Sequence, residues 1–163
     1  MESNDFSELP PGRILGIDYG ERRTGLAISD PSQVLSSSLS TLKGVDARQM
    51  LMRVTAAVRQ YDVVAIVVGM PFHMNHTVGS RCIQVRRFID SLRKICPVPI
   101  HTWDERWSTV SAEKTMIERG LSPSRNRDRV DQIAAAFILQ SFLDRLNVQR
   151  GLNVKPSDPD VRE

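Results

Sequence analysis

Acidic residues fall at three places where an α/β sheet would carry out chemistry. Asp18 ends the short apolar run RILGID, and the run VPIHTW ends in Asp104 and Glu105. Asp131 is the second residue of a long, mostly apolar segment, VDQIAAAFILQSFLDRL. Active sites of open α/β sheets lie at the carboxyl ends of the strands. The acids are far apart in the chain, but this topology can bring them to one edge because the first strand is normally central.

Carboxylates that meet without nearby lysines repel one another unless a cation neutralises them. Their hard oxygen atoms suit Mg²⁺ or Mn²⁺. One ion, or a pair about 3.5–4 Å apart, activates water and clamps a scissile phosphate, so the matching reaction is phosphodiester hydrolysis. We therefore predict that Asp18, Glu105 and Asp131 are catalytic residues and metal ligands, with no Ser, Cys or His nucleophile needed.

Each acid also has a simpler interpretation when it is taken alone. Asp18 would form an Asx-turn, Asp131 would cap a helix or favour its dipole, and Glu105 would pair with an arginine on the surface. His73 and His76 are spaced like a zinc pair, but no third ligand is near. We interpret these histidines as loop residues beside a substrate groove.

The hydrophobic pattern predicts the elements that must position these acids. Alternating or continuous apolar runs indicate strands, and apolar residues at helical spacing indicate helices. The expected strands are 13–18, 24–29, 33–42, 63–71 and 98–105. The expected helices are about 46–61, 78–95, 108–120 and 130–146. An antiparallel meander followed by strand-helix-strand crossovers predicts a mixed sheet with helices on both faces.

The length of 163 residues fits one domain. We expect a disordered leader over 1–12, a folded domain over 13–149 and a disordered tail over 150–163. The longest apolar run, Val63 to Val68, is far shorter than the ~20 residues of a membrane span. The first residues do not resemble a secretory signal. These features predict a cytoplasmic protein that does not enter a membrane.

Basic residues are concentrated in two segments, although the net charge is only +3. Segment 78–95 has five basic residues and one acid, and segment 119–129 has four arginines and one acid. Such local excess is typical of proteins that bind polyanions. Arg22 and Arg23 follow Asp18 in the predicted hairpin turn, where we expect them to contact a phosphate backbone.

Four blocks of the sequence resemble one known family. RILGIDYGERRTGLAISDP, VVGMPFHMN, VPIHTWDERWSTVSAE and VDQIAAAFILQSFLD resemble the YqgF/RuvX family of ribonuclease H-like proteins, from about Arg13 to Leu146. The resemblance implies an α/β fold, with a five-stranded mixed sheet of strand order 3-2-1-4-5 and helices on both faces. It also implies a cytoplasmic nuclease that processes the 5′ end of the 16S ribosomal RNA precursor. An older description of the family is Holliday junction resolvase-like.

By this resemblance, Asp18, Glu105 and Asp131 occupy the family's active-site positions. Relatives usually have a lysine-rich run before the last acid, where this chain has SRNRDRVD. The resemblance therefore assigns the phosphate contacts to arginines and makes Asp128 an additional negative charge. The arginines are Arg125, Arg127 and Arg129.

Four functions remain open at this point. The first is a metal-dependent nuclease acting on structured RNA such as precursor ribosomal RNA. The second is a Holliday junction resolvase, which cuts branched DNA as a homodimer. The third is a module that binds RNA or ribosomal particles without cutting, as a monomer or homodimer. The fourth, ATP binding through GIDYGERRTG, needs a second lobe for which the chain has no room.

Overall fold

A computed structural model describes residues 6, 8–71, 79–104, 113, 115–122 and 124–151. Five strands form a mixed sheet in the order β3-β2-β1-β4-β5. They are β1 (Arg13–Asp18), β2 (Arg23–Ser29), β3 (Ser36–Lys43), β4 (Val63–Met70) and β5 (Ile100–Asp104). β1 pairs antiparallel with β2 and parallel with β4, and β4 pairs parallel with β5. The predicted mixed sheet and its strand order are confirmed.

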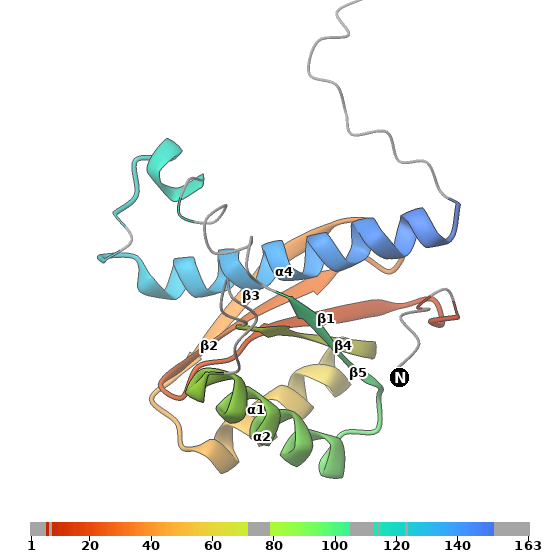
Figure 1. Ribbon diagram of the computed structural model, residues 1–163, viewed down its shortest axis with the longest axis horizontal. Coiled ribbons are helices and arrows are strands. Elements are labelled where there is room, and N and C mark those ends of the chain that lie inside the picture. Colours follow the sequence, from red (N-terminus) through yellow and green to blue (C-terminus); the bar gives the residue numbers. More distant parts are fainter. Residues whose placement is uncertain are drawn as a thin grey trace, which may run out of the picture.

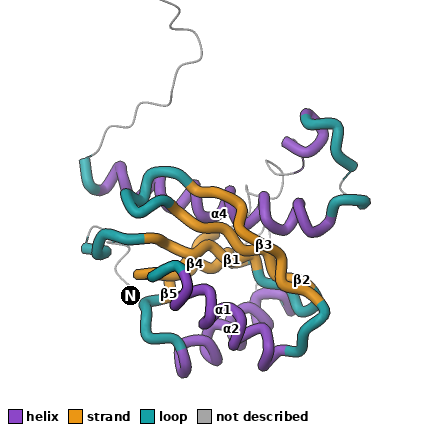
Figure 2. The backbone as a smooth tube through the Cα atoms, turned by 180° about the vertical axis from the view of Figure 1, so that it is seen from behind, coloured by secondary structure: helices purple, strands orange, loops and turns teal. Residues whose placement is uncertain are grey.

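Helices cover both faces of this sheet, as predicted. Figure 1 shows α4 (Arg127–Gln149) above the sheet and α1 (Ala47–Gln60) and α2 (Ser80–Ile95) below it. The same two layers are seen from behind in Figure 2. β4 is apolar throughout because alternate side chains point to opposite faces. Ala65 and Val67 pack in the core under α4, whereas Ile66 and Val68 pack in the core with α1 and α2.

Local hydrogen bonds explain where two elements begin. The Asp46 carboxylate accepts the Gln49 backbone N–H at 2.8 Å, and the Gln49 side chain accepts the Asp46 N–H at 3.1 Å. This capping box starts α1 where the sequence predicts it. β3 begins at Ser36, later than predicted, because the Asp30 carboxylate accepts the N–H groups of Val34 and Leu35, both at 2.8 Å. These bonds hold residues 30–35 in a turn.

α4 is longer at its start than predicted. It begins at Arg127 rather than at 130, so Arg127 and Asp128 lie in its first turn and not in a loop. Most of the predicted helix 108–120 lies outside the described residues. Among the described helices, none is both long and apolar enough to cross a membrane.

Residues before the predicted domain start also pack on the core. Phe6 is buried against Phe142, with ring centroids 5.0 Å apart, and its N–H donates to the Gln149 side chain at 3.2 Å. The Arg150 guanidinium donates to the Leu9 carbonyl at 3.0 Å. These contacts involve residues outside the expected limits of 13 and 149, and they connect Phe6 and Leu9 with the C-terminal half of α4 and Arg150.

Two glycines allow α4 to lie unusually close to the sheet. A Cβ on Gly25 in β2 would lie 2.0 Å from the Asp131 carbonyl oxygen, and one on Gly16 in β1 would lie 2.8 Å from Leu139 Cβ. Gly25 is also the residue that pairs with Asp18 across β1 and β2. The close contact at Gly25 therefore puts the backbone of Asp131 directly over the strand pair that carries Asp18.

We expect Gly25→Ala to lower the free energy of unfolding by at least about 3 kcal/mol, the upper part of the range for overpacking. The added methyl meets backbone, so it can be accommodated only if α4 moves away. Urea unfolding would measure the loss. Gly44→Ala is the control. Nothing lies within 4 Å of the position that a Cβ would take at Gly44, so only the positive φ of +68° disfavours the alanine. The control substitution should lower the free energy of unfolding by about 1 kcal/mol. An equal decrease in both variants would contradict the close contact at Gly25.

Candidate active site

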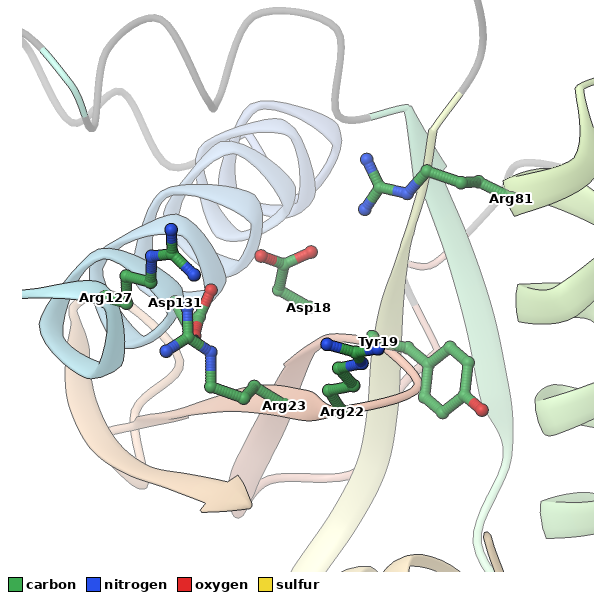
Figure 3. A pocket seen from close by; sticks show the side chains of 8 residues that line it. Asp18, Tyr19, Arg22, Arg23, Arg81, Arg127 and Asp131 are labelled. Carbon is green, nitrogen blue, oxygen red and sulfur yellow. The ribbon is translucent and has the colours of Figure 1, made fainter. Parts of the chain in front are cut away.

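Asp18 and Asp131 line one pocket at the carboxyl end of β1. The pocket has a volume of about 360 Å³, and its lining residues are Asp18, Tyr19, Gly20, Arg22, Arg23, Arg81, Arg127 and Asp131. Figure 3 shows the Asp18 carboxylate among these side chains, with Arg23, Arg127 and Asp131 on one side and Arg81 on the other. The structure thus brings together two of the three predicted acids.

The third predicted acid, Glu105, lies outside the described residues, as do His73 and His76. The strand register still fixes the end of β5 that precedes Glu105. Ile17 pairs with Val68 of β4, and Met70 pairs with Asp104 of β5. Because β1, β4 and β5 are parallel, Asp18 and Asp104 end at the same edge of the sheet, as the sequence argument required.

A chain of alternating charges runs from β3 to Asp131. The Lys43 ammonium lies 2.5 Å from the Asp128 carboxylate, whose other oxygen lies 3.6 Å from an Arg23 guanidinium nitrogen. Arg23 Nε in turn lies 3.3 Å from Asp131 Oδ2. Asp128 is therefore not the isolated extra charge that the sequence suggested. It is neutralised by Lys43 and holds Arg23 beside Asp131.

Burial raises the pKa of the Asp131 carboxyl above its usual value. The Arg23 guanidinium lowers this pKa, Asp128 raises it and Arg127 lowers it, but burial dominates. Asp131 Oδ2 is buried and accepts no hydrogen bond from the described residues. An anionic oxygen that has one ion pair, with Arg23, but no hydrogen bond is incompletely compensated for its burial, so a further cation placed against it would be favourable.

Four arginines surround the two carboxylates of the pocket. Arg22, Arg23 and Arg127 were predicted to contact phosphate, and all three line the pocket. Arg125 and Arg129, which were predicted with them, are exposed and do not line it. The fourth arginine is Arg81, which the sequence argument counted only among the basic residues of a helix. The sequence signal available for Arg81 was its place near the start of the helix that follows β4.

The four guanidinium groups change the electrostatic case for a metal at this site. From the sequence, a cation is expected because carboxylates without nearby lysines repel one another. Arg23 supplies such a cation to Asp131, so repulsion alone does not require a metal. The donor set still fits one, since two carboxylates share a pocket and Asp131 Oδ2 lacks a hydrogen bond. No group of three or more ligating side chains is found in the described part of the chain, which omits Glu105.

Tyr19 connects the turn after β1 to the layer that carries Arg81. Its ring stacks on Phe88 of α2 with centroids 4.2 Å apart and planes 14° from parallel. Burial and the neighbouring charge of Glu21 raise the pKa of Tyr19, so its phenol is neutral at physiological pH. The stack holds the Asp18 turn against α2.

The chain was compared with known proteins. The family model described as "RuvX: Holliday junction resolvase" matches residues 12–145. This chain belongs to the RuvX family. A protein of Roseiflexus sp. (strain RS-1) is 44% identical over 134 residues, which are 82% of this chain and 95% of the relative. A protein of Ruminiclostridium cellulolyticum is 41% identical over 135 residues, again 82% and 95%. Both RuvX relatives are named "Putative pre-16S rRNA nuclease".

Solved structures share the RuvX fold at low sequence identity. RuvC of T. thermophilus in complex with a Holliday junction has a TM-score of 0.54 at 16% identity, covering 82% of this chain and 96% of that chain. The Fowlpox virus resolvase with Holliday junction DNA has a TM-score of 0.52 at 14% identity, covering 82% and 98%. These likenesses establish the ribonuclease H-like fold that the sequence predicted.

The charges around Asp131 predict opposite effects of two substitutions on its pKa. Arg23→Gln should raise the pKa of Asp131 further, because the guanidinium lowers it, whereas Asp128→Asn should lower it by removing a like charge. Carboxyl ¹³C NMR titration of the metal-free protein would measure both. Shifts in the same direction would contradict the charge arrangement.

The same raised pKa has a consequence for stability. The folded-state pKa of Asp131 exceeds that of the unfolded chain, so its contribution is fully present below the unfolded pKa, about 4. The contribution is lost as the pH rises through the folded pKa. Asp131→Asn should therefore unfold at a higher temperature than the original protein at pH 7, without metal, and the difference should vanish at pH 3. A lower midpoint at pH 7 would contradict the burial argument.

Proposed function

We propose that this protein is a metal-dependent nuclease that hydrolyses phosphodiester bonds of structured RNA and matures the 5′ end of the 16S ribosomal RNA precursor. The observation that carries the proposal is the convergence of two carboxylates and four guanidinium groups in one pocket. The carboxylates suit a divalent cation, and the excess of guanidinium groups suits the phosphates of a polyanion. The names of the RuvX relatives support RNA as the substrate.

Asp18, Asp131 and Glu105 would hold one or two Mg²⁺ or Mn²⁺ ions. When bound, the metal supplies activation of the attacking water and Lewis-acid stabilisation of the phosphate. Without the metal, Arg23 lies against Asp131 Oδ2, restrains this carboxylate and partly offsets the effect of burial on its pKa. Asp128 restrains the other end of the same guanidinium. These contacts restrain the Asp131 carboxylate, one of the proposed ligands, in the absence of a cation or substrate.

The remaining arginines orient the scissile strand. Arg22 lies in the turn after β1, Arg127 in the first turn of α4 and Arg81 in the first turn of α2. A guanidinium group binds a phosphate through two parallel hydrogen bonds, which fix the orientation of the phosphate as well as its position. Three arginines on three separate elements would thus hold the backbone across the carboxylates. Arg125 and Arg129 extend the basic surface outside the pocket.

A second candidate is cleavage of branched DNA, because the matching RuvX family model is described as a Holliday junction resolvase. That reaction needs two sites related by symmetry in a homodimer. RNA processing needs one site and suits a monomer or a homodimer. We propose action in the cytoplasm, on precursor ribosomal RNA either free or within ribosomal particles.

We expect Asp18→Asn, Glu105→Gln and Asp131→Asn each to lower the rate of RNA cleavage by at least about 100-fold, because each removes a proposed metal ligand. Purified protein would be incubated with precursor ribosomal RNA and with four-way DNA junctions in Mg²⁺ or Mn²⁺. Asp144→Asn is the matched control, since Asp144 is exposed on α4 outside the pocket.

Three outcomes decide between the functions. Cleavage of the RNA and not of the junction supports the primary proposal, and the reverse supports the resolvase. RNA binding without cleavage in either metal supports the non-cleaving module. Full activity of any one acidic variant removes that residue from the proposed site.

A separate prediction concerns Arg81, the pocket residue that the sequence argument did not assign. Arg81→Ala should weaken RNA binding by about 10-fold and reduce the slope of log affinity against log salt by about one, as for one lost phosphate contact. Arg145→Ala is the control, on an exposed position of α4 far along the helix from Asp131. Fluorescence anisotropy without divalent metal would measure binding. Equal effects of the two variants would contradict a local role for Arg81.

A further inference from the structure

The two helical layers of the molecule differ sharply in charge. α1 and α2 together carry eight basic residues and one acidic residue, Asp90. α4, on the other face of the sheet, carries three of each. The net charge of the whole chain is only +3, but the layer formed by α1 and α2 is strongly basic.

No salt bridge within the described part of the chain neutralises the charges of this layer. The salt bridges found among the described residues join Arg23 or Lys43 to acids of α4, and none involves α1 or α2. All eight basic side chains are exposed. Arg93 donates to the Ile100 carbonyl at 3.2 Å and so holds β5. The others are available to a ligand of opposite charge.

The basic layer begins at the candidate active site. α1 and α2 contact each other and lie side by side under the sheet (Figures 1 and 2). Arg81, in the first turn of α2, lines the pocket, and the 16 residues of that helix extend about 24 Å at 1.5 Å per residue. Arg86, Arg87 and Lys94 follow along its exposed side. A nucleic acid that extends from the pocket past Arg81 would therefore reach the helix that carries these further cations.

The exposed side chains of the layer suit a phosphate backbone and not unpaired bases. Proteins that bind single strands stack the bases on exposed aromatic rings. α1 has no aromatic residue, and Phe88, the one in α2, is buried under Tyr19. Cations without aromatic platforms match double-stranded nucleic acid, which is recognised through its backbone and shape.

We propose that the exposed faces of α1 and α2 form a second nucleic-acid-binding surface, which holds the backbone of an RNA duplex flanking the strand in the pocket. We define this α1–α2 basic face by Arg48, Arg59, Arg86, Arg87 and Lys94. The inference rests on the proposed function for the identity of the ligand, since the pocket is proposed to hold RNA. It adds that the protein selects substrates in which a duplex adjoins the bond to be cut.

The test compares two double substitutions that change the net charge equally. Arg86→Glu with Arg87→Glu alters the basic face, and Arg145→Glu with Lys155→Glu alters basic residues that belong to neither of the two basic segments. Binding of the full chain would be measured by fluorescence anisotropy without divalent metal. The probes are an RNA duplex with a single-stranded 5′ extension, the extension alone, and a DNA duplex of the same length. Circular dichroism and thermal unfolding would establish that each variant folds. If the basic-face variant does not fold, the neutral pair Arg86→Gln with Arg87→Gln takes its place.

We expect the basic-face variant to bind the extended RNA duplex at least about 10-fold more weakly, with a salt slope reduced by about two. It should bind the single strand within about threefold of the original protein, and the control variant should bind every probe within the same limit. Unchanged duplex binding would overturn the proposal. So would an equal loss in the control variant, an equal loss for the single strand, or a loss confined to DNA.

The failure of this proposal is distinguishable from failure of the proposed function. Cleavage of the same RNA by the unsubstituted protein in Mg²⁺ would be recorded in parallel. Absence of cleavage with the expected loss of duplex binding overturns the nuclease and keeps the basic face. Cleavage by the unsubstituted protein, together with unchanged duplex binding in the basic-face variant, supports the nuclease and overturns the basic face.

Discussion

The carbonyl oxygen of Asp131 occupies the space that a side chain at residue 25 would need, 2.0 Å from the Cβ position of Gly25. This contact sets the distance between α4 and the sheet, and the candidate site depends on it. Gly25 pairs with Asp18 across the β1–β2 hairpin, so the helix backbone and the strand end meet at one point. Gly16 allows the same close packing further along the helix, against Leu139. Two carboxylates from distant parts of the chain are thereby held in one pocket by backbone packing.

The pocket carries groups that suit two ligands of opposite charge. Asp18 and Asp131 suit a cation, while the arginines around them exceed them in number and suit an anion. Arg23 belongs to both sets, because it pairs with Asp131 and is restrained by Asp128, which Lys43 neutralises. The basic layer of α1 and α2 continues this arrangement outward from Arg81.

The strands, the helix faces and the start of α1 were predictable because their causes are local. Apolar periodicity marks a strand or helix in the sequence itself, and the Asp46–Gln49 capping box spans four residues. The strand order came from the resemblance of four blocks to a family, and it is confirmed. Phe6 was placed in a disordered leader because an acidic, proline-containing segment has no local signal for order. Its burial depends on Phe142 and Gln149, at the opposite end of the chain.

By itself, the sequence determined the elements and the acids that end or begin them, since hydrophobic pattern and residue type are local properties. Tertiary structure decided which charges meet. Lys43 and Asp128 are 85 residues apart in the chain, and no local rule pairs them. In the sequence, Arg81 is one of several arginines of a predicted helix. In the fold, the packing of α2 places Arg81 in the same pocket as Asp18 (Figure 3). Ion pairs and pockets form between side chains that the chain brings together only when the sheet and its two helical layers close, so their partners depend on the folded geometry.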